Sequence, residues 1–260
     1  MAWLNGWLYR KKITIQGQSG AGTDYQVLLK VGESSGASGC DFHVEGHSSN
    51  FPSDNNQSGD LRFTKSDETT LLNFWVEKVE GTSPNRVAHC WVKVEDNLDN
   101  NVDIYCYYGN SDATNVSNGD NTFIFFDDFE NTTDFNQGSL STSFTTANVK
   151  TGSYAIKGEG NQSYKTKTIN QNSGRNKIFE TWIMLKASSN TSLAGVQIAQ
   201  PSTEANGYQF LLDQRSSYKD VQIRKDHIGD PLLASGSKQG ELSEDIWYFL
   251  RVIWLSLIHI

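Results

Sequence analysis

The sequence has few cysteines, no long apolar run and no concentration of positive charge, and each absence excludes a class of protein. Its three cysteines, Cys40, Cys90 and Cys106, are an odd number, which excludes a fully paired disulfide framework. No stretch approaches the ~18 consecutive apolar residues of a transmembrane helix, so we expect no membrane span. The formal net charge of −8 argues against nucleic acid as a partner, because phosphate binding needs a basic surface.

The N-terminal stretch also lacks the order of a secretory leader. In MAWLNGWLYRKK the charges follow the apolar residues, whereas in a signal peptide they precede them. We therefore expect either that the protein is not exported by that route or that its natural N-terminus lies upstream.

Short runs of alternating apolar and polar residues fill the first half of the chain. In NVDIYCYYG, for example, Val102, Ile104, Cys106 and Tyr108 fall on one face of a strand. No helical pattern separates these runs, which indicates an antiparallel sandwich. The expected strands cover residues 8–15, 24–31, 60–65, 71–79, 86–94 and 102–108. Residues 32–59, rich in Gly, Ser and Asn, predict a long loop.

Cys90 and Cys106 fall in two of these expected strands. Two interpretations stay open, a cross-strand disulfide bridge and a pair of small buried thiols. We favour the buried thiols, because free cysteine is among the most buried residue types.

A polar segment interrupts the strand pattern in the middle of the chain. Residues 110–121 contain no apolar run and are dominated by Asn, Ser, Gly and Asp, which is typical of a linker. Apolar residues return at 123–126. Further strands are expected at 153–157, 178–186, 207–213, 220–224 and 246–254.

Several motifs of the first half resemble one family in order and spacing. They are WLNGWLYRKKITI, GDLRFTKSDETTLLNFWVEKV, HCWVKV and IYCYYGNSDAT. Over about residues 3–115 the sequence resembles the family called domain of unknown function 2341. The resemblance implies a β-sandwich found in bacterial, archaeal and viral proteins that are often multidomain and surface-exposed, and it implies no known activity. A concanavalin A-like or laminin G-like sandwich usually follows such a domain, and FIFFDDFE looks like the opening strand of one.

The predicted fold is all-β, with two tandem antiparallel, jelly-roll-like β-sandwiches. We expect the first at residues 3–115, a linker at 116–121 and an incomplete second sandwich at 122–254. The hexapeptide LSLIHI at 255–260 resembles the translated end of a sequencing adapter, so we expect the natural sequence to end near Trp254. The alternative is a genuine apolar terminal strand.

Two groups of residues have metal-ligating chemistry. Cys40, Asp41, His43 and His47 could bind zinc, but they lie in a Gly/Ser-rich loop with no second ligand pair, which favours ordinary loop hydrogen bonds. The carboxylates of Asp127, Asp128 and Glu130 at a strand end suit a structural calcium ion. The alternative is a solvated turn, and no cofactor is required by the prediction.

No catalytic pattern stands out in the sequence. A glycosidase needs two carboxylates about 5–10 Å apart, and the compact E-x-D-x-E type of strand that concanavalin-like glycosidases use is missing. Ser-His-Asp and Cys-His arrangements lack motif context as well. We therefore predict that the chain is not an enzyme.

One face of the second half has the residues of a carbohydrate site. If its strands pair in one sheet, an aromatic ring and planar polar groups lie together on an outward face, which suits the C–H faces and hydroxyls of a sugar. The alternative is a core tryptophan among solvated polar residues. The candidate residues are Trp182, Glu180, Gln209, Asp213, Gln222 and Arg224.

These observations predict a non-catalytic module outside the cell, on a cell surface or on a virion, that recognises carbohydrate or a cell-surface protein in adhesion. The alternatives are a structural spacer in a long surface or fibre protein, and an ancillary binding module of a carbohydrate-active enzyme.

Overall fold

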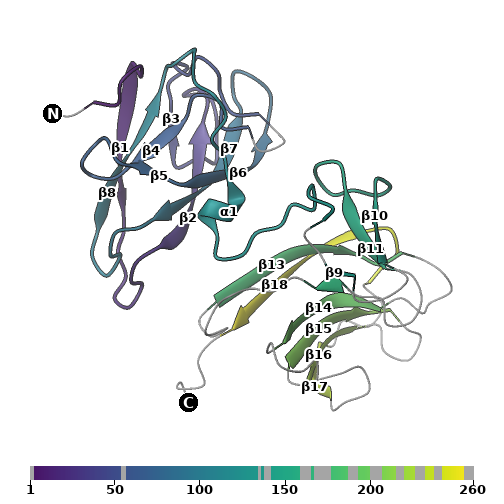
Figure 1. Cartoon of the computed structure of the whole chain (residues 1–260). Helices are drawn as coiled ribbons and strands as arrows, with labels where there is room; N and C mark the ends of the chain where they lie inside the picture. The colour runs from purple at the N-terminus through teal and green to yellow at the C-terminus, as the bar shows by residue number, and fades with distance from the viewer. Residues whose placement is uncertain are drawn as a thin grey trace. The chain divides into compact units, whose positions relative to one another are not determined.

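The computed structural model of the chain consists of β-strands joined by turns and irregular segments, so the all-β prediction is confirmed (Figure 1). The structure describes residues 3–53, 57–133, 136–137, 142–158, 165–166, 177–186, 193–199, 207–214, 220–225, 232–236 and 242–254. Within these ranges the only helix is α1 (Gly119–Thr122), and none is long and apolar enough to cross a membrane. The chain divides into one unit made of Met1–Asn131 and Thr151–Tyr154 and a second made of Thr132–Lys150 and Ala155–Ile260.

The first unit is a sandwich of two four-stranded sheets (Figure 1). One sheet has the order β1 (Tyr9–Ile15), β8 (Val102–Tyr108), β4 (Arg62–Thr64), β5 (Leu71–Leu72). The other has the order β3 (Phe42–His43), β2 (Tyr25–Gly32), β7 (Val87–Val94), β6 (Phe74–Glu80). All neighbours are antiparallel except β2 and β3, which are parallel.

Alternation along the strands places the core between these two sheets. On β8, Ile104, Cys106 and Tyr108 point into the core, as the sequence pattern predicts. Phe63 and Phe74 come from opposite sheets, and their rings meet edge to face at 5.0 Å.

The expected strand at 71–79 is two strands in the structure. β5 pairs with β4 in one sheet, whereas β6 pairs with β7 in the other. The chain changes sheet at the exposed Asn73, so Leu72 and Phe74 enter the same core from opposite sides. The two-residue period continues across the change of sheet, so the sequence pattern does not reveal it.

Cys90 and Cys106 are free and fully buried in this core, which confirms the favoured interpretation over the disulfide. Burial raises the pKa of the Cys90 thiol to about 12 and raises that of Cys106 well above its usual value, because the thiolate loses its hydration.

The polar segment and the apolar residues that follow it pack on the outer face of β6 and β7. The buried Ser117 accepts a hydrogen bond from Val76 N through its Oγ at 2.8 Å, and Asn118 N donates to Phe74 O at 2.9 Å. The ring of Phe126 meets that of Trp75 at 4.8 Å. Residues 123–126 are therefore not a strand, and their aromatic side chains cover the first unit instead.

The second unit consists of antiparallel pairs and one larger sheet (Figure 1). The pairs are β10 (Thr142–Thr145) with β11 (Ala155–Gly158), β9 (Asn136–Gln137) with β12 (Lys165–Thr166), and β13 (Lys177–Met184) with β18 (Trp247–Trp254). The larger sheet has the order β14 (Leu193–Ala199), β15 (Gly207–Asp213), β16 (Asp220–Lys225), β17 (Leu232–Ser235). The prediction for residues 255–260 lies outside the described residues.

Candidate functional site

One face of the β13–β18 pair presents large apolar side chains to solvent. The register sets Trp182 opposite Phe249 and Ile178 opposite Ile253, so all four share a face. Their exposed fractions are 42%, 45%, 58% and 57% in that order. The rings of Trp182 and Phe249 lie 5.1 Å apart with a 51° tilt, and together they form an aromatic platform.

Charged groups border this platform. Glu180 and Arg251, also opposite each other in the register, form an ion pair with Arg251 Nε 2.5 Å from Glu180 Oε1. The ammonium of Lys150 lies over one side of the Trp182 ring, 4.0 Å from its centre. We call the set Ile178, Glu180, Trp182, Phe249, Arg251 and Ile253 the ribbon face. It combines ring surface for C–H contacts with groups that hydrogen-bond hydroxyls.

The other four predicted sugar-binding residues lie elsewhere. Gln209 and Arg224 are opposite each other on β15 and β16, and Asp213 and Gln222 lie on the same face of that sheet. All four are buried, with exposed fractions of 0–7%. The expected single outward face is therefore wrong: β13 belongs to a different sheet from β15 and β16, and the face on the larger sheet is covered. Alternation predicts which side chains share a face, but not which face is covered.

These buried polar groups bond to one another along β16. Arg224 Nε donates to Gln222 Oε1 at 2.8 Å, and Gln222 Nε2 donates to Asp220 Oδ1 at 2.8 Å. Such a row satisfies buried polar atoms that would otherwise destabilise the fold. Asp220, at the end of the row and opposite Asp213, is a member that the sequence analysis missed. Asp220 lies two residues before Gln222 and therefore on the same strand face, and this spacing could have identified it from the sequence.

The predicted calcium ligands serve as hydrogen-bond acceptors for backbone amides. Asp127 Oδ1 accepts from Phe129 N at 2.8 Å, and Asp128 Oδ1 accepts from Glu130 N at 3.2 Å. Glu130 Oε1 accepts from the amides of Ser153 and Tyr154 at 2.7 and 3.1 Å. The carboxylates of Asp127 and Asp128 thus each stabilise a local turn, and the carboxylate of Glu130 holds the segment of Ser153 and Tyr154 beside it.

Of the Cys40–His47 group, the structure brings only Cys40 and His43 together. Cys40 Sγ and His43 Nε2 both contact Ala37 O, at 3.6 and 3.0 Å. Asp41 Oδ2 instead accepts from Lys30 N at 2.7 Å, and the ring of His47 stacks on Tyr9. Across the described residues, no three His, Cys, Asp or Glu side chains gather as a metal site would require.

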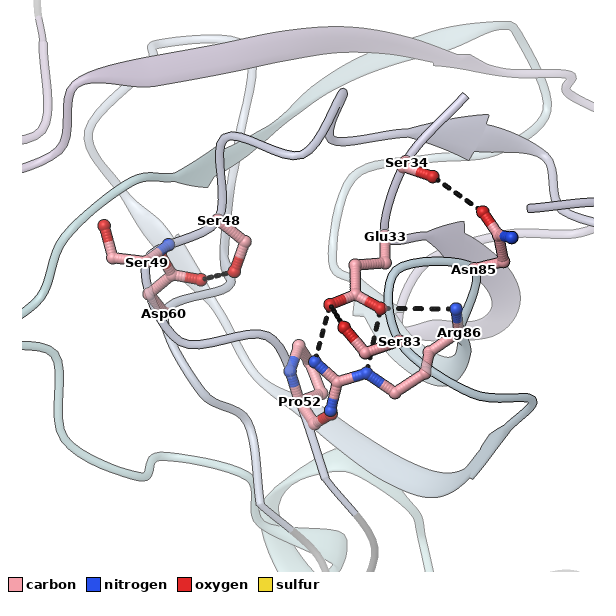
Figure 2. Close-up of polar contacts among 9 residues, drawn as sticks. All are labelled: Glu33, Ser34, Ser48, Ser49, Pro52, Asp60, Ser83, Asn85 and Arg86. Atoms are coloured by element: carbon pink, nitrogen blue, oxygen red, sulfur yellow. Dashed lines mark hydrogen bonds and ion pairs between the residues drawn. The ribbon is translucent and has the colours of Figure 1, made fainter. Parts of the chain in front are cut away.

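A bidentate ion pair between Glu33 and Arg86 joins the start of the long loop after β2 to the residue that precedes β7. Arg86 Nε and Nη2 donate to the two carboxylate oxygens of Glu33 at 2.9 and 2.7 Å, and Ser83 Oγ adds a third bond at 3.0 Å (Figure 2). These bonds, led by those from Arg86, lower the pKa of Glu33. Because Glu33 directly follows β2 and Arg86 directly precedes β7, the pair fixes both strand ends.

Asp60 anchors the far end of the same loop from a fully buried position. Its carboxylate accepts from Ser48 Oγ at 2.5 Å and from the amide of Ser49 at 2.6 Å (Figure 2). It also accepts from the amides of Gly109 and Asn110 at 2.8 and 3.2 Å. Sequence reasoning did not single out Asp60 or the Glu33–Arg86 pair, because their partners are distant in the chain.

Comparison with known proteins gives one partial match. Residues 57–140 match the family model described as domain of unknown function (DUF2341), which supports the resemblance of the first half. No curated protein and no solved structure matches the chain significantly.

Proposed function

We propose that this chain is a non-catalytic binding module of a cell-surface or virion protein and that it recognises glycans through the ribbon face. The observation that carries the proposal is the exposed aromatic pair of Trp182 and Phe249, bordered by the Glu180–Arg251 ion pair. A contiguous exposed apolar patch that is rimmed by polar residues is typical of an interaction site.

The chemistry of the face favours a sugar over a purely apolar ligand. A pyranose ring presents C–H groups on one side, which pack on an aromatic ring, and hydroxyls at its edge. At the ribbon face, Glu180 accepts and Arg251 donates hydrogen bonds beside the aromatic platform. The proposal requires no cofactor.

A second candidate is a structural spacer in which the ribbon face packs against a neighbouring domain or partner protein. The exposed aliphatic side chains of Ile178 and Ile253 favour it, because aliphatic groups suit a dry protein contact better than a hydrated sugar.

A glycan array probed with the purified chain, followed by affinity measurements on the best oligosaccharide, separates the two candidates. The matched variants are Trp182→Ala and Phe249→Ala, with Tyr25→Ala as the control because Tyr25 is an equally exposed aromatic residue on the first unit. We expect binding to fall about tenfold or more in the first two variants and to stay unchanged in the control, since losing one stacked ring costs about 1.4 kcal/mol or more.

Absence of binding to every glycan, with Trp182→Ala lowering only stability, would contradict glycan recognition and favour the spacer.

A further inference from the structure

The first unit contains a polar cavity of about 380 Å³ on the outer face of the β2–β7–β6 sheet. Val87 and His89 of β7 line it, together with Lys30 of β2 and Glu80 at the end of β6. Gly81 after β6, Asn85, and Gly36, Ser38 and Gly39 from the segment after β2 complete the lining. The volume lies at the small end of the range for ligand sites, about 300–1,000 Å³, which suits a single small ligand rather than a long polymer.

The charges around the cavity are arranged across neighbouring strands. Lys30 and Lys78 each stand opposite His89 in the register, on either side of it. Glu80 bonds to His89 Nε2 at 2.9 Å and to Lys78 Nζ at 2.5 Å, so its negative charge is already compensated. Among the lining side chains, Lys30 is therefore the charged group that has no ion-pair partner in the described part of the chain.

Two hydrogen-bond donors at the cavity remain unused. Within the described part of the chain, neither Lys30 Nζ nor Asn85 Nδ2 has a hydrogen-bond or ion-pair partner. The Asn85 side chain is nevertheless fixed, because its Oδ1 accepts from Ser34 Oγ at 3.0 Å (Figure 2). Gly36 packs so closely that a Cβ there would lie 2.4 Å from Asn85 Oδ1. The amide is therefore held in one orientation before any ligand arrives, which reduces the entropy cost of binding.

We propose that this cavity binds an acidic monosaccharide, a small ligand with one carboxylate and several hydroxyls. The Lys30 ammonium pairs with the carboxylate, and Asn85 Nδ2 donates to a ligand oxygen. The outward-facing part of Glu80, which is 56% exposed, accepts from ligand hydroxyls. This site lies in the first unit and does not depend on the ribbon face of the second.

The test is a titration of the ¹⁵N-labelled full chain with D-glucuronate, with D-glucose and acetate as matched probes. D-glucose has the hydroxyls without the carboxylate, and acetate has the carboxylate without the hydroxyls. We expect D-glucuronate to shift the amide signals of Gly36, Gly81 and Asn85, and both other probes to bind about tenfold more weakly or not at all.

Two variants locate the binding groups. Lys30→Met removes the charge and keeps the aliphatic stem. Asn85→Asp keeps the acceptor for Ser34 and replaces the donor by a carboxylate. Each should weaken D-glucuronate binding about tenfold or more, as the loss of one charge-assisted hydrogen bond predicts. Lys93→Met, on the same sheet but paired with Asp24 outside the cavity, is the control and should bind normally.

Unshifted cavity amides at saturating D-glucuronate would overturn the proposal, as would undiminished binding in Lys30→Met. Equal affinity for acetate would overturn the assignment to a sugar acid. None of these results bears on the ribbon face, which is tested with variants of the other unit.

Discussion

At the scale of single residues, the buried and half-buried charges of the first unit hold the backbone in place. Glu33 and Arg86 have side chains only 12% and 26% exposed, and their two-point contact joins the ends of β2 and β7. Asp60 does the same by joining the amide of Ser49, within the long loop, to that of Gly109, which follows β8. We expect changes at these positions to act on stability.

Glu33→Gln tests the contribution of the ion pair through its pH dependence. The pKa of Glu33 is lowered in the fold, so its stabilisation is complete above the unfolded pKa, about 4.3, and is lost as the pH falls through the folded pKa. We expect the variant to be about 2 kcal/mol less stable at neutral pH, and to lose less further stability than the wild type between about pH 6 and pH 3.

Urea denaturation followed by the NMR signals of β7 measures both effects in the first unit alone. Glu45→Gln is the control, because Glu45 is 46% exposed in its ion pair with Lys11. Parallel acid profiles for the wild type and Glu33→Gln would contradict the assignment.

Two tryptophans on the outer face of the β6–β7 pair differ in their hydrogen bonding. Trp91 Nε1 donates to Glu77 Oε2 at 2.9 Å, whereas Trp75 Nε1 is buried with no partner among the described residues. Trp91→Phe should therefore cost about 1 kcal/mol more stability than Trp75→Phe, since only the first loses a hydrogen bond. Hydrogen exchange of the β7 amides gives both free energies. A larger loss in Trp75→Phe would show that this indole nitrogen is satisfied.

At the scale of elements, the sequence predicts best the strands that alternate over seven or eight residues, and it misses several that lack this alternation. β1, β2, β7 and β8 all overlap predicted ranges within one or two residues. β3 has only two residues, and β17 is exposed along its whole length, so neither produces a period-two signal. In β14, Gly195 breaks the apolar pattern. Whether a short or uniformly exposed segment forms a strand depends more on the strands that it pairs with than on its own residues.

The segment around α1 shows the same limit. Asn118 Oδ1 accepts from Asn121 N at 2.9 Å, an N-cap that the sequence contained but that a general excess of Asn concealed. The side chains that attach the segment, Ser117, Phe123 and Phe126, give no local sign that their partners are β6 and β7.

A fragment of residues 3–131 should therefore be more stable than a fragment of residues 3–115. The shorter fragment lacks the bond to Ser117 and uncovers the rings of Trp75 and Trp91. We expect a difference of about 3 kcal/mol or more, because two aromatic side chains lose their buried contacts. Urea denaturation followed by tryptophan fluorescence measures it. Equal urea midpoints for the two fragments would show that residues 116–131 add no stability to the first unit.

At the scale of the whole molecule, both units bury charged side chains among their apolar residues. The first unit buries Asp60 beside a continuous apolar core between its sheets. Within its described residues, the second unit buries Asp213 and Arg224 and exposes the aromatic pair of Trp182 and Phe249. The sequence predicted that Trp182 and Glu180 share a face, but Phe249 and Arg251 were not included, because only the β13–β18 register brings them opposite.

The most direct test of glycan recognition by the ribbon face follows the indole signal of Trp182 while the chain is titrated with the oligosaccharide that binds best on the array. We expect this signal to shift with the ligand and to saturate at the same dissociation constant as binding, while the indole signals of Trp75 and Trp91 stay in place. Binding that leaves the Trp182 signal unmoved would contradict glycan recognition by this face.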